Sequence, residues 1–196
     1  HGATGYLLSS FTSPRTNLRR DMYGGSLENR MRFPLEVCRT VREVVGDFPV
    51  GYRLMAREYL PEGLSLEEGV IFAQAITHEL EPAYLSVTAG THECFASFSQ
   101  EEQKTSRGFM LPEAEAVKNA VHGTPVIAAG QLQDRAICEY VLREGVADAV
   151  GLGRVLFADI NWVRKSAGQD VDLIRNCVQC NNCQNQISQG KPAFCI

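Results

Sequence analysis

The sequence lacks both a long apolar run and an excess of positive charge. It has 19 Lys and Arg residues against 23 Asp and Glu residues, a net charge of -4. Without a bilayer-length apolar run, a transmembrane helix is excluded. The negative balance argues against nucleic acid or an anionic membrane as a partner. The opening residues show no charged stretch followed by an apolar one, the pattern of a secretory signal. We therefore expect a cytoplasmic protein with small-molecule partners, and leave homo-oligomerisation open.

Strand and helix patterns alternate along the chain, and 44% of its 196 residues are apolar, enough for the core of one domain. Helical periodicity covers residues 30–45, 65–78, 112–121 and 134–145. Short, mostly apolar segments that fit strands lie at residues 50–54, 84–87, 125–129 and 149–152. Such alternation predicts an α/β fold with a parallel sheet covered by helices. The pattern alone leaves a barrel and a doubly wound sheet equally open.

The seven cysteines are unevenly placed. Three lie singly in apolar or loop contexts and are expected to be free thiols: Cys38, Cys94 and Cys138. The other four form a C-x2-C-x2-C-x11-C pattern: Cys177, Cys180, Cys183 and Cys195. This spacing suits a [4Fe-4S] cluster or a four-cysteine zinc site, and spacing alone does not choose between them. A reducing cytosol makes disulfides the weakest alternative.

The opening of the chain is dense in turn and charge residues. Residues 1–6 (HGATGY) lead to residues 21–33 (DMYGGSLENRMRF), and residues 13–30 hold two glycines, one proline and four arginines. A long loop of this composition usually carries function. The segment resembles the signature of the Old Yellow Enzyme superfamily of FMN-dependent oxidoreductases, in its 2,4-dienoyl-CoA reductase and trimethylamine dehydrogenase branch.

This resemblance implies a TIM barrel, of which the chain would supply the C-terminal half. Residues 1–164 would form strands 5 to 8 of the FMN-binding (β/α)8 barrel together with the loop after strand 4. A complete barrel needs about 250 residues. Residues 165–196 would form a linker and a Cys-rich segment that binds a [4Fe-4S] cluster, the choice that the family favours over zinc. In relatives a flavin domain, with FAD, follows the cluster and oxidises NAD(P)H, and we expect it to lie outside this chain.

Four residues match the FMN-binding positions of the family: Arg53, Gly130, Gly153 and Arg154. The two glycines follow the last two expected strands, where this fold binds phosphate and where the absence of a side chain lets an anion approach the backbone. Arg154 adds positive charge beside them. Arg53 stands in an apolar strand and needs a buried partner. The family places this arginine at the pyrimidine edge of the flavin, and a salt bridge to Glu58 is the alternative.

Three further residues match the substrate side of the family site. Tyr6 corresponds to the tyrosine that protonates the substrate carbon next to the carbonyl, and His1 to a residue that hydrogen-bonds that carbonyl. His92 resembles the histidine that dienoyl-CoA reductases place near substrate and flavin. The alternatives are a tyrosine packed in its loop and solvated histidines. Thr4 stands where many Old Yellow Enzymes have Asn or a second His, so we expect a modified carbonyl clamp.

Three functions are compatible with these features. The first is an FMN-dependent ene-reductase acting on an activated C=C bond of enoate or dienoyl-CoA type, with electrons from NAD(P)H arriving through the cluster. The second is an amine dehydrogenase or demethylase, which the sequence supports less. Such enzymes often cage a methylated cation with aromatic rings, and the single tryptophan, Trp162, lies on an expected helix away from the strand ends. The third is a non-catalytic barrel fragment with a structural zinc site.

Overall fold

Four parallel strands form the centre of the molecule. The computed structural model describes residues 1–97, 107–168 and 170–196. Its sheet contains β1 (Gly51–Met55), β2 (Tyr84–Thr88), β3 (Val126–Ala128) and β4 (Ala149–Val150), in the order β1-β2-β3-β4. All three pairings are parallel. A doubly wound sheet reverses its strand order at a switch point. This sheet has no reversal, so its units follow one another as they do in a barrel.

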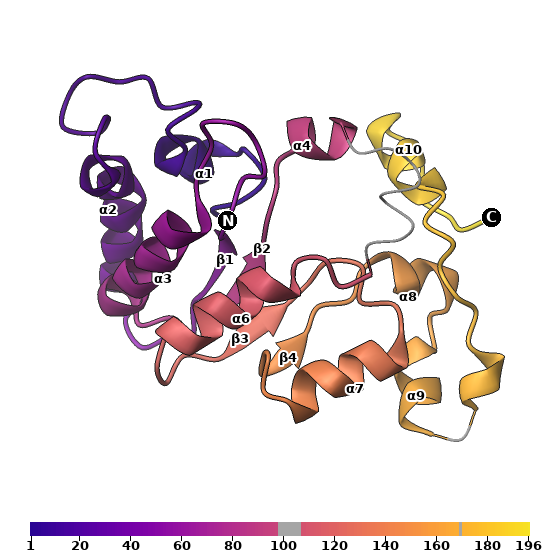
Figure 1. Ribbon diagram of the computed structural model, residues 1–196. Helices are drawn as coiled ribbons and strands as arrows, with labels where there is room; N and C mark the ends of the chain where they lie inside the picture. Colours follow the sequence, from indigo (N-terminus) through magenta and orange to yellow (C-terminus); the bar gives the residue numbers. More distant parts are fainter. Residues whose placement is uncertain (98–106, 169) are drawn as a thin grey trace.

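Four longer helices accompany the strands (Figure 1). They are α2 (Leu27–Val45), α3 (Leu66–Leu80), α6 (Leu111–Ala120) and α7 (Arg135–Arg143). Helix α6 packs on β2 and β3, α7 packs on β4, and α2 packs on α3. The hydrophobic core formed by these helices and strands contains the largest fully buried side chains, among them Phe72, Leu54 and Leu85. The strands are apolar because the helices cover them, and the predicted half-barrel is confirmed.

Local signals set the bounds of the helices. The predicted capping box is present at the start of α3, where the Ser65 side chain accepts from the Glu68 N–H and the Glu68 side chain accepts in return. Asp134 caps α7 by accepting from the Ala136 N–H at 2.9 Å. Helix α2 ends at Gly46, as its position in the sequence predicts.

Hydrophobic periodicity in the sequence did not predict most of the shorter helices. These are α1 (Leu7–Thr12), α4 (His92–Ser97), α8 (Arg154–Ala158), the 3-10 turn η1 (Val171–Leu173) and α10 (Asn182–Ser188). Helix α9 (Trp162–Ala167) contains the tryptophan that the sequence places on a helix. One or two turns are too few for an apolar stripe to repeat, so such helices leave little trace in the sequence.

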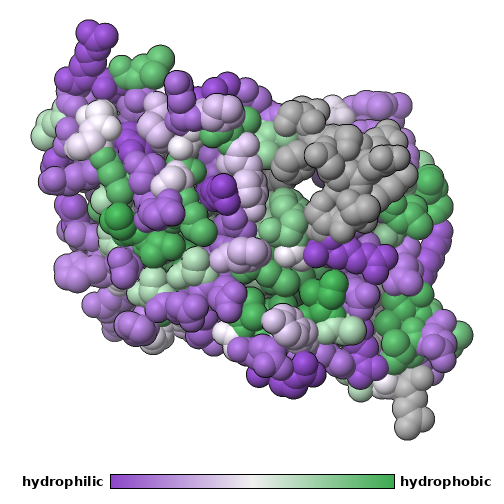
Figure 2. Space-filling model, in the orientation of Figure 1, coloured by the Kyte–Doolittle hydropathy of each residue, from purple (hydrophilic) through white to green (hydrophobic). Residues whose placement is uncertain are grey.

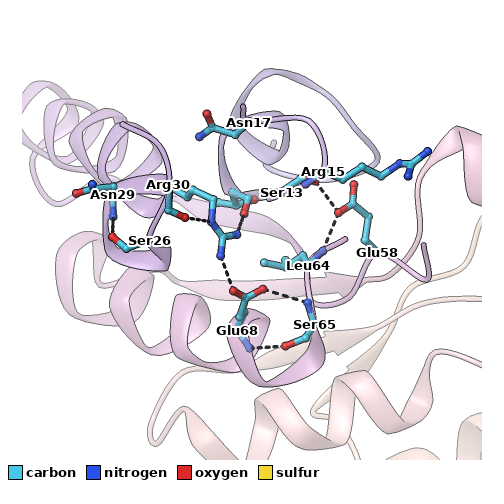
Figure 3. Close-up of polar contacts among 12 residues, drawn as sticks. Ser13, Arg15, Asn17, Ser26, Asn29, Arg30, Glu58, Leu64, Ser65 and Glu68 are labelled. Atoms are coloured by element: carbon cyan, nitrogen blue, oxygen red, sulfur yellow. Dashed lines mark hydrogen bonds and ion pairs between the residues drawn. The ribbon is translucent and has the colours of Figure 1, made fainter. Parts of the chain in front are cut away.

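Arg30 of the opening signature is a structural clamp. Its side chain is only 4% exposed and donates to the Thr12 carbonyl, to the Gly25 carbonyl at 3.2 Å and to the Glu68 carboxylate. Figure 3 shows the guanidinium between the opening loop and α3. A buried guanidinium is tolerated when its donors find such partners. One residue thus joins the opening loop, α2 and α3.

Two further residues of the signature hold the loop in shape. The Asn17 amide donates to the Phe11 and Tyr23 carbonyls, each at 2.7 Å. The Ser13 hydroxyl donates to the Glu58 carboxylate at 2.7 Å, and the Leu64 N–H donates to the same carboxylate at 2.8 Å (Figure 3). Much of the signature therefore has a structural role: its side chains hold the opening loop in its conformation and attach it to the rest of the fold.

Polar residues cover most of the surface seen in Figure 2, with apolar residues in patches between them. Large apolar side chains are exposed on and after α8, with Phe157 48%, Ile160 86% and Val163 57% exposed. In the described part of the chain, no helix has the length and apolar character needed to cross a membrane.

Candidate functional site

A cavity of about 330 Å³ lies at the carboxyl ends of β3 and β4. Its lining includes all four residues that the sequence proposes for FMN: Arg53, Gly130, Gly153 and Arg154. They come from the strand β1, the segment after β3 and the segment after β4. The structure therefore brings residues from positions 53 to 154 together at the end of the sheet where barrels bind their ligands.

Gly130 occupies a position that only glycine suits. Its φ is +113°, and a Cβ built there would lie 2.9 Å from the Cγ and Sδ atoms of Met110. Gly153 differs, because a Cβ added to it meets no atom within 4 Å. The backbone at Gly153 is therefore open to a ligand. A side chain at this position would occupy the space that the ligand needs.

Arg53 carries a partly buried charge without a carboxylate partner among the described residues. Its Nη1 donates to the Ser86 Oγ at 2.6 Å, across the register that pairs β1 with β2. Burial lowers the pKa of this guanidinium. The alternative of a salt bridge to Glu58 is not found, because that carboxylate accepts from Ser13 and the Leu64 N–H instead. The charge faces the cavity and suits an anionic or carbonyl-rich ligand.

Arg154 connects the cavity with the cysteine segment. Its Nη1 donates to the Asn181 Oδ1 at 2.5 Å. Asn181 lies between Cys180 and Cys183, and its φ of +58° places it in the left-handed region. The cavity and the Cys-rich loop are therefore neighbours in the folded chain.

These residues fit FMN. The phosphate would meet the open backbone at Gly153 and the positive charge of Arg154, as anions do at glycine-rich strand ends. The flavin ring would meet Arg53, whose charge lacks an acidic partner in the described chain. Among the described residues that line the cavity there is no Asp or Glu to oppose such a ligand.

The three predicted substrate-side residues also lie together. The Tyr6 ring is edge-on to the His1 ring at a centroid distance of 5.2 Å, and edge-on to the His92 ring at 5.9 Å. Tyr6 is 57% exposed, so its phenol is open to a ligand. Thr4, the residue that departs from the family pattern, has a φ of +62°, which is strained for a β-branched side chain.

Backbone pairing fixes this aromatic cluster beside β1, although none of its three rings is among the described residues that line the cavity. The Gly2 N–H donates to the Arg53 carbonyl at 2.8 Å and the Gly2 carbonyl accepts from the Met55 N–H at 3.2 Å. Thr4 forms a parallel bridge with Thr91, the residue before His92. The opening segment thus runs beside β1, whose Arg53 side chain lines the cavity.

An ion pair holds α4 against the opening loop. Arg15 Nη2 donates to the Glu93 carboxylate at 2.6 Å, and both side chains are partly exposed. Glu93 is the neighbour of His92, so this pair helps to set where the imidazole lies. The sequence places His92 at a strand end, and the structure places it at the first residue of α4.

The four cysteines of the C-terminal segment are free thiols. Hydrogen bonds bring the two ends of the pattern near each other, since Asn182 Nδ2 donates to the Phe194 carbonyl at 3.1 Å and Arg175 donates to the Ile196 carbonyl. Within the described ranges, no three His, Cys, Asp or Glu residues come together as a metal site. The donor chemistry suits a cluster or zinc, but the sulfur atoms are not gathered, so the metal-binding role of these cysteines stays a prediction.

The sequence missed three residues that line the cavity or bond a residue of its lining. Ser86 is the partner of Arg53, Asn181 is the partner of Arg154, and Gln131 lines the cavity after Gly130. The first two depend on strand register and on a contact across 27 residues, which periodicity does not encode. Gln131 could have been suspected from its place next to a strand-end glycine.

Known proteins resemble almost the whole chain. The sequence model of the NADH:flavin oxidoreductase / NADH oxidase family matches residues 1–171. An NADH oxidase from Thermoanaerobacter brockii is 41% identical over 182 residues, which is 92% of this chain and 28% of the relative. A multifunctional alkene reductase/demethylase OYE from Caballeronia cordobensis is 36% identical over 93% of this chain and 27% of its own length.

A solved structure of 2-naphthoyl-CoA reductase in complex with 2-naphthoyl-CoA superposes with a TM-score of 0.91 at 28% identity, covering 99% of this chain and 29% of that one. The chain thus spans less than a third of the length of these relatives. The match of fold and sequence agrees with the resemblance to Old Yellow Enzymes, and the chain belongs to the NADH:flavin oxidoreductase / NADH oxidase family.

Proposed function

We propose that the chain is part of an FMN-dependent ene-reductase that reduces an activated C=C bond of enoate or dienoyl-CoA type. The observation that carries the proposal is the gathering of Tyr6, His1 and His92 next to the strand whose Arg53 lines the cavity. When bound, FMN supplies a hydride for the β-carbon of such a substrate. The relatives named alkene reductase and 2-naphthoyl-CoA reductase support this class of substrate.

The three rings have distinct tasks in this proposal. Tyr6 donates its phenol proton to the α-carbon, since a positioned weak acid can protonate a carbon that gains negative charge. His1 donates a hydrogen bond to the substrate carbonyl. His92, edge-on to the Tyr6 ring, keeps the phenol in place and offers a second donor to the same carbonyl.

The supply of electrons is the second part of the proposal. NAD(P)H is the reductant that the family uses, and the four C-terminal cysteines would hold a [4Fe-4S] cluster that carries single electrons. The hydrogen bond between Arg154 and Asn181 supports this arrangement, because it ties the cysteine loop to the residues that line the cavity.

Tyr6→Phe in the complete gene product that contains this chain tests the chemical step. We expect alkene reduction to slow by about 10²-fold or more, because the proton donor is removed. Reduction of the flavin by NAD(P)H should continue at the normal rate. Tyr140→Phe, at a half-exposed tyrosine on α7, is the matched control and should leave both steps unchanged. Unchanged turnover in Tyr6→Phe would remove this phenol from the mechanism.

Oxidative demethylation of an amine is the second candidate, supported by the relative that is named both alkene reductase and demethylase. Trp162 does not contribute a cage for a methylated cation, since it is 5% exposed and packs in the core. Anaerobic mixing of the oxidised protein with N-methylated amines separates the two candidates. Bleaching of the flavin by an amine would favour the demethylase, and reoxidation of the reduced flavin by an enoate would favour the ene-reductase.

A further inference from the structure

Arg15 joins three segments at the carboxyl end of the sheet. It belongs to the opening loop, and in Figure 3 its side chain extends away from Arg30. Its Nη2 donates to the Glu93 carboxylate of α4 at 2.6 Å, and its Nη1 donates to the Pro61 carbonyl at 3.4 Å. The guanidinium therefore connects the opening loop with the segments that follow β1 and β2, and it does not line the FMN cavity.

The backbone that carries Arg15 is itself held in place. The Arg15 N–H donates to the Ser13 Oγ at 3.2 Å, and the Ser13 hydroxyl donates to the Glu58 carboxylate at 2.7 Å. Ser13 and Glu58 are both buried. Arg15 thus reaches α4 from a fixed base, and its ion pair loses less side-chain entropy than one formed by an arginine on a free loop.

The first turn of α4 is held to the opening segment on both sides of His92. Thr91, the residue before it, forms the parallel bridge with Thr4. Glu93, the residue after it, forms the ion pair with Arg15. His92 itself is exposed, so its own packing does not fix the imidazole. The position of this ring depends on the contacts of its two neighbours.

We propose that Arg15 is a positioning residue for the proton transfer, because through Glu93 it holds His92 edge-on to Tyr6. This inference rests on the proposed ene-reductase function. The His92 and Tyr6 rings lie 5.9 Å apart, and Tyr6 is 57% exposed. A displacement of about 1 Å at a reacting group can cost about 10²-fold in rate. A partly exposed ion pair contributes little to stability, so this pair matters more for the rate than for the fold.

The test uses the complete gene product with its flavin bound and follows reoxidation of the reduced flavin by an enoate without oxygen. In Arg15→Gln and in Glu93→Gln we expect this step to slow by about tenfold, because either change breaks the same pair. Arg15→Lys keeps the charge and should recover part of the rate. FMN affinity and the rate of flavin reduction by NAD(P)H should stay the same, since neither residue lines the cavity.

The His92→Ala background separates positioning from a general weakening of the fold. If Arg15 acts through His92, Arg15→Gln slows the His92→Ala variant no further, whereas independent effects would multiply. Arg39→Gln is the matched control, because it removes an ion pair of the same 2.6 Å length between α2 and α3. It should reoxidise its flavin at the normal rate.

Three results would overturn the inference. A normal rate in Arg15→Gln would show that the pair does not set the position of the imidazole. A slow Arg15→Gln beside a normal Glu93→Gln would show that Arg15 acts without its partner. Multiplied losses in the variant that carries both His92→Ala and Arg15→Gln would show that Arg15 does not act through His92. If the unaltered protein did not reoxidise its flavin with an enoate, the proposed function itself would fail, which is a separate result.

Discussion

Arg53 shows how one residue can be better explained by a ligand than by the fold. Its hydrogen bond to Ser86 satisfies part of the guanidinium, and burial already lowers its pKa. Arg53→Met keeps much of the side-chain volume and removes a charge that the described chain does not pair. We expect the apoprotein to unfold at the same or a higher temperature, while FMN affinity falls about 10- to 100-fold, as for a lost charged hydrogen bond.

The measurements for Arg53→Met are thermal unfolding without flavin and fluorescence titration with FMN. Arg143→Met, at an exposed arginine on α7, controls for loss of one positive charge. A variant that unfolds more easily but binds FMN normally would make Arg53 a structural residue.

We expect the buried Cys38 and Cys138 to react more slowly with alkylating reagents than the exposed Cys180. Burial raises the pKa of Cys38 and of Cys138 to about 11. At pH 8 only about one in a thousand of these thiols is then ionised, and the thiolate is the form that alkylates. In metal-free protein we expect iodoacetamide to label the exposed Cys180 at pH 8 and to leave Cys38 and Cys138 unlabelled.

Peptide mass spectrometry after timed labelling checks this contrast. Raising the pH from 8 toward 11 should increase labelling of Cys38 and Cys138, because the shift is upward and the thiols ionise only as the pH approaches 11. Rapid labelling of Cys38 at pH 8 in the folded protein would contradict its burial.

At the scale of helices, the contact between α2 and α3 combines a buried and an exposed ion pair. Arg30 is 4% exposed in its pair with Glu68, whereas Arg39 is 50% exposed in its pair with Glu79. We expect Arg30→Met to lower the free energy of unfolding by about 3 kcal/mol, because it leaves carbonyls and a carboxylate unpaired. Arg39→Met should cost less than about 1 kcal/mol. Urea denaturation curves measure both, and equal losses would show that Arg30 is no clamp.

Helices and strands with local signals were predictable, and those defined by distant contacts were not. Ser65 and Asp134 cap their helices as their spacing predicts, because a cap involves only residues two to three positions apart. The role of Arg30 could not be predicted from the sequence, since its partner Glu68 lies 38 residues away. The signature identifies the family, but several of its polar residues, such as Arg30, Asn17 and Ser13, form hydrogen bonds that stabilise the fold.

The same distinction holds for the candidate site. Gly130 and Gly153 could be chosen because strand ends of a parallel sheet gather at one edge, which a sequence can indicate. The partner of Arg53 could not, because Ser86 faces it only in the register that β1 and β2 adopt. The backbone conformation of Gln131 could not be predicted either, since a positive φ at a residue other than glycine is a property of the folded backbone.

At the scale of the whole molecule, the cysteine segment is attached to the half-barrel at two places. Asp159 is buried and accepts from Lys165 Nζ at 2.6 Å and from the Arg175 N–H at 3.0 Å. The Lys165 ammonium, followed by that backbone N–H, lowers the pKa of the Asp159 carboxyl. Arg154 holds Asn181 at the second place. The segment is therefore anchored on both sides of Cys177 before any metal is considered.

We predict that this anchored segment binds a metal centre through its four cysteines. If its four cysteines hold a [4Fe-4S] cluster, the complete gene product purified without oxygen should contain about four iron and four acid-labile sulfide atoms per chain. Cys180→Ser should lose most of both, because it removes one ligand, while Cys138→Ser, at a buried thiol outside the pattern, should keep them. Zinc without sulfide would instead indicate a structural site, and the proposed route for electrons through this segment would then be wrong.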